Sequence, residues 1–223
     1  MILRTFVLQN TNFYVILYLE REVQNMNKKT LALTKEQYKE IIDTMRKGFS
    51  GGRPNHRVAT ALVLEANLGI RISDIVPTKD KNGNQLKGLR LCDIVKDGGR
   101  YRLDIIEKKT QKSRTFTVPT EIYNYIQQYC IDNELKRTDT IFPITERAVQ
   151  KHLKAVCDYL GYDGISTHSF RKFFATNVYN DNDHNIALVQ ELLQHSSPVI
   201  TQRYIGISRK ELEVALQKNV NLL

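Results

Sequence analysis

The feature that most limits the possible folds is a single block of strand-like sequence, residues 91–118, between two helical stretches. Three short segments in it have strand character: residues 91–95, 101–106 and 115–118. Lys96-Asp-Gly-Gly is a hairpin signal, and the basic sequence KKTQKS predicts a second turn. The block therefore predicts a three-stranded antiparallel sheet. We expect its exposed tip to hold Lys108, Lys109 and Lys112.

The sequence on both sides of this block is typical of helices. Thr34, followed three residues later by Gln37, forms a capping-box pattern before apolar residues at helical spacing. Other signals predict helix starts at Thr120 and Thr145 and helix ends at Gly69 and Gly161. The polar stretch from Pro77 to Gly88 predicts a loop or small turn. The predicted fold class is α+β, mainly α with one small antiparallel sheet.

At 223 residues the chain can form one large domain or two small ones, and we find no linker or internal repeat. We expect one domain over residues 31–223, preceded by a leader or partial segment over residues 1–30. Met26 is an alternative start of translation. The longest apolar run near the N-terminus, residues 13–19, is too short to span a bilayer, so we expect no membrane association.

The net charge of +9 and pI of about 9.4 indicate a polyanionic partner, either nucleic acid or an anionic membrane surface. Three cysteines lie far apart in the sequence, without metal-ligand spacing: Cys92, Cys130 and Cys157. Because the cysteines are odd in number and widely spaced, we expect reduced thiols and a cytoplasmic protein.

One C-terminal stretch, residues 167–204, contains the residues with the clearest chemical potential. His168 and Arg171 stand three apart at a predicted helix start, so they share a helix face. His195 follows a second helical run, and Ser197-Pro198 predicts the start of a third helix, which contains Tyr204. Two imidazoles, a fixed cation and a phenol can bind and attack a phosphodiester without a metal.

With Arg71 and Lys109, these residues form an ordered set that resembles the catalytic domain of the tyrosine recombinases, the phage-integrase family that includes Cre and the Xer proteins. The matching motifs are Leu68-Gly69-Ile70-Arg71-Ile72-Ser73-Asp74, Lys109-Thr110, His168-Ser169-Phe170-Arg171, Leu193-Gln194-His195-Ser196-Ser197 and Thr201-Gln202-Arg203-Tyr204. Each motif alone is weak, but six matched residues in order, each on the expected element, are specific. The resemblance covers residue 29 to the C-terminus.

The resemblance implies how a phosphodiester would be bound and attacked. Arg71 and Arg171 would clamp its non-bridging oxygens bidentately. His195 would donate a further hydrogen bond to the same phosphate, and Tyr204 would be the nucleophile, because a phosphotyrosine conserves the bond energy.

The proton transfers are the next implication. A tyrosine with an ordinary pKa of about 10 needs a base, and His168 is the candidate. Lys109 would protonate the departing 5′-oxygen, although Lys108 or Lys112 competes for this role. Asp74 would orient Arg71 or His168. We expect no cofactor, ATP or metal, because clustered carboxylates with metal-ligand spacing are absent from the sequence.

Each residue alone also has an ordinary structural interpretation. Tyr204 is one of 11 tyrosines and could pack in a core, Arg71 could pair with Asp74 at the surface, and His195 could cap a helix. If all these structural interpretations were correct at once, the order of the six residues would have to be a coincidence. Gln194 replaces the family's glycine, which changes the backbone freedom of that turn without removing a catalytic atom.

The function that the sequence predicts is site-specific DNA recombination through a 3′-phosphotyrosyl intermediate. Double-stranded DNA would be the partner, with a homotetramer on two DNA sites and a helix over residues 211–220 docking on a neighbour. Two alternatives stay open: a type IB topoisomerase-like enzyme, and a non-catalytic DNA-binding remnant of an integrase. Family members usually have a further N-terminal helical domain, so the chain is predicted to be either a compact recombinase or a fragment.

Overall fold

The computed structural model describes residues 30, 32–79, 82–108, 111, 113–205 and 217. The predicted segments 1–29 and 211–220, apart from residue 217, lie outside these residues, as do Lys109 and Lys112. The main helices are α2 (Lys35–Lys47), α3 (His56–Leu68), α5 (Thr120–Asp132), α6 (Glu146–Leu160), α7 (Thr167–Asp181), α8 (Ile186–Leu193) and α9 (Pro198–Ile205).

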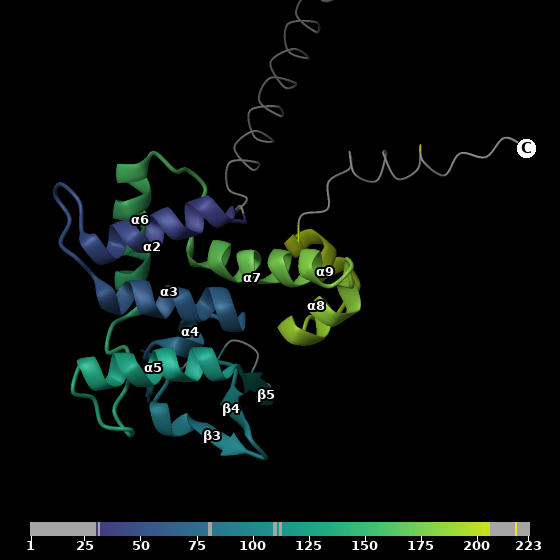
Figure 1. Cartoon of the computed structure of the whole chain (residues 1–223), viewed down its shortest axis with the longest axis horizontal. Helices are drawn as coiled ribbons and strands as arrows, with labels where there is room; N and C mark the ends of the chain where they lie inside the picture. The colour runs from purple at the N-terminus through teal and green to yellow at the C-terminus, as the bar shows by residue number, and fades with distance from the viewer. Residues whose placement is uncertain are drawn as a thin grey trace, which may run out of the picture.

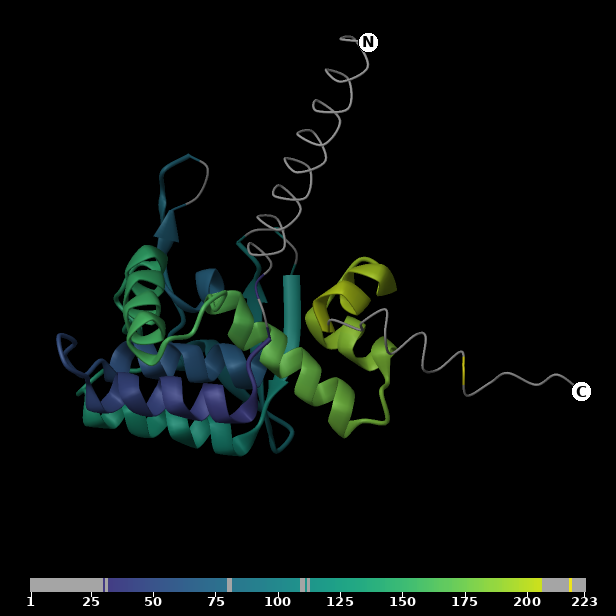
Figure 2. The ribbon, with the colours of Figure 1, turned by 90° about the horizontal axis from the view of Figure 1, so that it is seen from above.

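Helix α3 lies at the centre because it is apolar on nearly every side. Ten of its 13 residues are buried, and it packs against α2, α6 and α7. Figure 1 shows α3 between α2 and α5, with α7 running from this body toward α8 and α9. The last two helices pack on α7 in a separate small core around Ala175, Val189 and Leu193. Figure 2 shows α8 and α9 beyond the body that contains α2, α3 and α6.

The predicted three-stranded antiparallel sheet is confirmed, in the order β3 (Ile94–Asp97), β4 (Arg100–Ile106) and β5 (Ser113–Val118). The hairpin signal at Lys96 joins β3 to β4, with Asp97 opposite Arg100. The predicted start of the first strand, at residue 91, was wrong, because the strand begins at Ile94. Residues Leu91–Asp93 form the 3-10 helix η1, because the Asp93 carboxylate accepts hydrogen bonds from the backbone N–H and the guanidinium of Arg90.

A second, two-stranded sheet occupies the stretch predicted as a loop or small turn. Strands β1 (Thr78–Lys79) and β2 (Gln85–Leu86) pair antiparallel, so the polar stretch is a short hairpin. Its base lies directly after α4 (Ile72–Ile75), beside the site described below.

The predicted helix boundaries are confirmed at most positions. The Thr34–Gln37 capping box is present, Thr145 caps α6, and Gly161 ends α6 in the left-handed region with φ 73°. The predicted cap at Thr120 was wrong by one residue. Pro119 is extended and its carbonyl accepts the N–H of Tyr123 at 3.0 Å, so α5 begins with Thr120 as its first helical residue.

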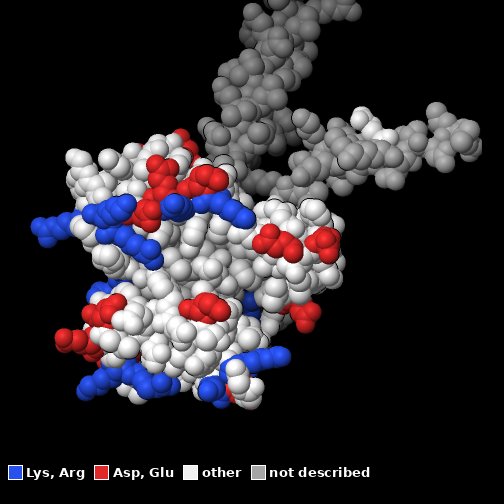
Figure 3. Space-filling model, viewed as in Figure 1, with Lys and Arg blue, Asp and Glu red and all other residues white. Residues whose placement is uncertain are grey.

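Among the described residues, no helix has the length and apolar character needed to cross a membrane. The molecular face in Figure 3 has lysine and arginine together with aspartate and glutamate, separated by a broad uncharged area. This face therefore does not itself single out an anion-binding surface. A concentration of cations is found instead in the interior, at the junction of α3, the sheet and α7.

Candidate active site

Arg71 is placed by the abrupt end of α3. Gly69 ends that helix with φ +59°, and a Cβ there would lie 2.4 Å from the ring of Phe174, so both the backbone conformation and the space favour glycine. The chain then turns, and Arg71 becomes the N-cap residue of α4. Its Nη1 lies 2.6 Å from Oε2 of Glu107. This contact is an ion pair without regular hydrogen-bond geometry.

Glu107 and Arg114 are two site residues that the sequence motifs did not indicate. Oε1 of Glu107 lies 3.2 Å from Nη1 of Arg114, and both side chains are buried. One carboxylate is thus shared by two guanidiniums, Arg71 and Arg114. Burial lowers the pKa of Arg114, while the Glu107 charge opposes that shift. Arg114 also donates to the carbonyl oxygen of Leu192 at the end of α8.

Asp74 does not have the contact expected from the sequence. We expected it to orient Arg71 or His168, but its Oδ1 accepts the backbone N–H of Lys108 at 2.9 Å. Burial raises the pKa of Asp74, and its Oδ2 is buried without a hydrogen-bond partner among the described residues. Glu107 is the acidic neighbour of Arg71, because the turn after β4 brings it closer than the short helix α4 brings Asp74.

Lys108 is not at an exposed tip, contrary to the sequence prediction. It is partly buried, and its Nζ donates to the carbonyl oxygen of Val76 at 2.7 Å. This donation anchors the ammonium to the chain that follows α4, so Lys108 folds back onto the body. Burial lowers its pKa, an effect that the nearby Asp74 charge partly offsets.

Arg171 is 1% exposed and is tied to backbone at two ends of the site. It donates through Nη1 to the carbonyl of Gly69 and through Nη2 to the carbonyl of Leu193 at 3.0 Å. Burial lowers its pKa to about 10, so the guanidinium is still charged at neutral pH. A cation held in this way is already oriented before any ligand binds.

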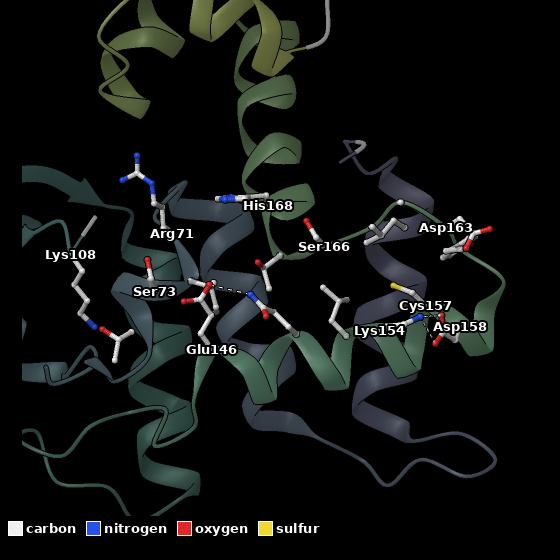
Figure 4. A pocket seen from close by; sticks show the side chains of 18 of the residues that line it. Arg71, Ser73, Lys108, Glu146, Lys154, Cys157, Asp158, Asp163, Ser166 and His168 are labelled. Atoms are coloured by element: carbon white, nitrogen blue, oxygen red, sulfur yellow. Dashed lines mark hydrogen bonds and ion pairs between the residues drawn. The ribbon is translucent and has the colours of Figure 1, made fainter. Parts of the chain in front are cut away.

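His168 lies in the first turn of α7, as predicted, and is exposed. It lines a pocket of about 690 Å³ together with Arg71, Lys79 and Lys108. Figure 4 shows the His168 imidazole at the edge of this pocket, on the side where Arg71 lies. His168 and Arg71 therefore face one cavity, which α4, α6 and the start of α7 enclose.

His195 follows a tight turn at the end of α8. Gln194 has φ 51° and ψ 44°, the left-handed conformation that glycine adopts most easily, and it ends the helix there. His195 Nδ1 lies 3.1 Å from Oγ1 of the fully buried Thr201. Desolvation, followed by the charges of Arg171, Arg71 and Arg114, lowers the pKa of His195 to about 4. The imidazole is therefore neutral at pH 7 and can offer one N–H.

Tyr204 lies on α9, which begins at Pro198 as predicted. Its ring meets the His195 ring edge-on with centroids 5.0 Å apart, and Nζ of Lys172 lies 5.7 Å from the Tyr204 centroid. The Tyr204 hydroxyl is buried without a hydrogen-bond partner of regular geometry among the described residues. Burial raises its pKa, and the nearby Arg171 charge opposes that shift.

The predicted site residues are thus brought together to different degrees. Arg171 connects the backbone beside Arg71 to the backbone beside His195, and Tyr204 packs on His195. His168 shares a pocket with Arg71. Asp74 lies at the base of the turn that leads to Lys109, a residue outside the described part of the chain.

The chain belongs to the phage integrase family, whose model matches residues 32–211. It is 31% identical over 166 residues to a probable integrase/recombinase, YoeC, of Bacillus subtilis, a match that covers 72% of this chain and 83% of YoeC. It is also 28% identical over 202 residues to the tyrosine recombinase XerA of Pyrococcus furiosus, covering 86% of this chain and 62% of XerA.

Solved structures show the same fold. The site-specific recombinase XerH aligns with a TM-score of 0.59 and 20% identity, over 86% of this chain and 54% of the XerH chain. The predicted fold class, mainly α with a small antiparallel sheet, is that of these proteins. The chain spans little more than half of XerH and about three fifths of XerA.

Proposed function

We propose that the chain is the catalytic part of a site-specific recombinase that cleaves and rejoins double-stranded DNA through Tyr204. The observation that supports this most is the position of Arg171. This buried cation donates hydrogen bonds to the carbonyls of Gly69, before Arg71, and Leu193, before His195. The Tyr204 hydroxyl, which has no regular hydrogen bond among the described residues, lies close to the charges of Arg171 and Arg71. This arrangement can bind an anionic phosphodiester next to the phenol that would attack it.

The proposed reaction exchanges one phosphorus–oxygen bond for another and transfers two protons. Tyr204 Oη attacks the phosphorus, the bond from phosphorus to the 5′-oxygen breaks, and a 3′-phosphotyrosine forms. Arg71 and Arg171 stabilise the charge on the non-bridging oxygens, and the neutral His195 donates its free N–H to one of them. The same steps in reverse, with a 5′-hydroxyl from a partner strand, rejoin the DNA.

His168 is the proposed acceptor of the phenol proton, because it lines the pocket that contains Arg71. Lys109 is the proposed donor to the departing 5′-oxygen. Its support is the anchoring of the preceding residue, since Asp74 accepts the backbone N–H of Lys108. Lys108 is a weaker candidate for the donor, because its Nζ is held by Val76. The chemistry needs no metal, because guanidiniums supply the positive charge.

The partner and the assembly are part of the proposal. The XerH structure that this chain resembles is bound to a palindromic difH substrate in a post-cleavage complex. The net charge of +9 suits a DNA partner as well. We propose synapsis as a homotetramer on two DNA sites, with residues 211–220 docking on a neighbouring copy, and a monomer or weak oligomer without DNA.

The test uses a library of duplexes that share one nick and are randomised on both sides of it. The nick lets the short fragment diffuse away after cleavage, so a covalent protein–DNA adduct accumulates in buffer with EDTA. Sequencing the DNA in the adduct identifies the cleaved site. We expect an adduct with the wild-type chain and none with Tyr204→Phe.

Two other outcomes would contradict the proposal. Binding to the library without any adduct would favour a DNA-binding remnant. Relaxation of supercoiled plasmid without sequence preference, by a monomer, would favour a type IB topoisomerase-like enzyme.

A further inference from the structure

Glu107 holds an unusual position among the buried charges of this site. It is 2% exposed, and its two carboxylate oxygens face different guanidiniums, Arg71 at 2.6 Å and Arg114 at 3.2 Å. A buried carboxylate is costly unless it is paired and well oriented. Here the pairing is with one residue of the proposed phosphate clamp and one residue that the mechanism does not use.

The pair of Glu107 and Arg114 lies at the end of the sheet where β4 and β5 are joined. Glu107 directly follows β4, and Arg114 is the second residue of β5, so the ion pair joins the adjacent ends of these two strands. Between the two strands, the carbonyl of Glu107 also accepts the N–H of Gln111 at 2.7 Å.

The same pair reaches the other end of the site. Arg114 donates to the carbonyl of Leu192, next to Leu193, whose carbonyl binds Arg171. Both carbonyls belong to the end of α8, shortly before His195. A continuous path of ion pairs and hydrogen bonds therefore runs from Arg71 through Glu107 and Arg114 to the His195 turn.

We propose that Glu107 is a positioning residue for the cleavage reaction, which fixes the guanidinium of Arg71 and, through Arg114, connects it to the turn before His195. This rests on the proposed function, because it assigns Glu107 a part in the same reaction. Glu107 touches neither substrate nor reacting atoms. It acts by removing freedom from a cation that must be oriented when charge develops on the phosphate.

The alternative effect of the same contact is sequestration. If Glu107 only neutralised Arg71 in the empty site, removing the carboxylate would free Arg71 and speed cleavage. The two effects therefore have opposite signs in a cleavage rate, which makes the rate decisive.

The experiment compares Glu107→Gln with Asp104→Asn on the preceding strand, β4. Asp104 is an exposed carboxylate paired with Arg102 at 3.1 Å, so the control removes the same charge from a surface ion pair. Single-turnover adduct formation on the nicked duplex found above gives the cleavage rate, and mobility shift on the same duplex gives Kd. We expect Glu107→Gln to slow cleavage by about 10- to 100-fold with Kd within about threefold of wild type. We expect Asp104→Asn to change neither.

Several results would overturn the proposal. Cleavage by folded Glu107→Gln at the wild-type rate or faster would exclude a positioning role, and so would a loss that appears in Kd and not in the rate. If Glu107→Gln does not fold at the assay temperature, Glu107→Asp takes its place. It keeps the charge but shortens the reach, and wild-type cleavage by that variant would also contradict the proposal.

A second measurement needs no DNA and separates this proposal from the proposed function. Phenylglyoxal adds to the guanidine nitrogens of arginine, so a carboxylate that pairs with Arg71 should protect it from modification. Mass spectrometry of the modified peptide should show faster modification of Arg71 in Glu107→Gln, by about threefold or more, and no change in Asp104→Asn. Equal rates would show that Glu107 does not hold Arg71. If the wild-type chain forms no adduct, the proposed function is refuted. The modification rate of Arg71 would then still show whether Glu107 holds the Arg71 guanidinium.

Discussion

Nη2 of Arg171 donates a hydrogen bond to the carbonyl oxygen of Leu193 at 3.0 Å, which ties α7 to the end of α8. The same guanidinium donates to Gly69 at the end of α3. The end of α3, about a hundred residues earlier in the sequence, therefore meets the consecutive helices α7 and α8 at one planar cation. The guanidinium has the fork of donors that can satisfy both carbonyls and still face a phosphate, which an ammonium lacks.

Arg171→Lys should weaken both the fold and the reaction. An ammonium cannot span Gly69 and Leu193, so one buried carbonyl loses its partner at a cost of about 1–3 kcal/mol in the free energy of unfolding. Loss of one preoriented donor should also slow cleavage by about 100-fold or more. Urea unfolding and single-turnover cleavage measure the two effects.

Arg46→Lys is the matched control for that change. Arg46 on α2 donates to the hydroxyl of Tyr125 on α5 at 2.8 Å, and no contact links it to the site residues, as far as the described residues show, so its replacement should leave cleavage at the wild-type rate. Equal cleavage by Arg171→Lys and wild type would contradict the role of Arg171.

Thr201→Val should lower the cleavage rate by about tenfold while the fold persists. The Thr201 hydroxyl lies 3.1 Å from Nδ1 of His195, so it determines which imidazole nitrogen faces the phosphate. Valine has the same shape without the hydroxyl. Single-turnover cleavage measures the effect, and thermal unfolding shows that the variant is folded.

Thr176→Val on α7 is its control. The Thr176 hydroxyl is buried without a hydrogen-bond partner among the described residues, so this substitution should be neutral or stabilising. If both valine variants cleave at the wild-type rate, the Thr201 hydroxyl does not orient His195.

His195 should make the protein less stable in mild acid. Its pKa is about 4 in the folded chain, below the ordinary value of 6.5. Between these values the unfolded chain binds a proton that the folded chain does not, so the free energy of unfolding decreases as pH falls from about 6.5 toward 4. Above about pH 6.5 the imidazole is neutral in both states, and its titration adds no further pH dependence.

The measurement is the melting temperature from pH 7.5 to 4. His195→Asn should show a smaller loss on acidification than wild type, whereas His152→Gln, at an exposed position of α6, should follow the wild-type curve. Identical curves for His195→Asn and wild type would show that the imidazole is not desolvated.

Gln194→Gly should stabilise the fold by up to about 1 kcal/mol, because glycine has no Cβ penalty at φ 51°. Glu191→Gly, an exposed position inside α8, should instead destabilise by about 1 kcal/mol. Urea unfolding of both variants measures the difference. A destabilised Gln194→Gly would mean that the Gln194 side chain matters more than its backbone strain.

Much of the fold could be predicted because its signals are local. The Thr34–Gln37 capping box and the Gly69 and Gly161 helix ends involve residues within one turn of each other, and the hairpin at Lys96 is equally local. Thr120 shows the limit, since the extended Pro119 moved the helix start by one residue.

The partners of the site residues could not be predicted because they depend on tertiary packing. Glu107 meets Arg71 only when the sheet docks beside α4, and Lys108 folds back to Val76 for the same reason. The sequence contained one usable signal, a carboxylate directly before the basic turn, but several carboxylates compete for one arginine. Gln194 marked an unusual turn, whose left-handed conformation only the backbone could reveal.

The proposed function requires that Tyr204 becomes covalently joined to DNA. The direct measurement is mass spectrometry of the adduct formed on the nicked duplex, after digestion with nuclease and protease. We expect a peptide in which Tyr204 bears a nucleotide through its 3′-phosphate. A nucleotide on any other residue, or one joined through a 5′-phosphate, would contradict it.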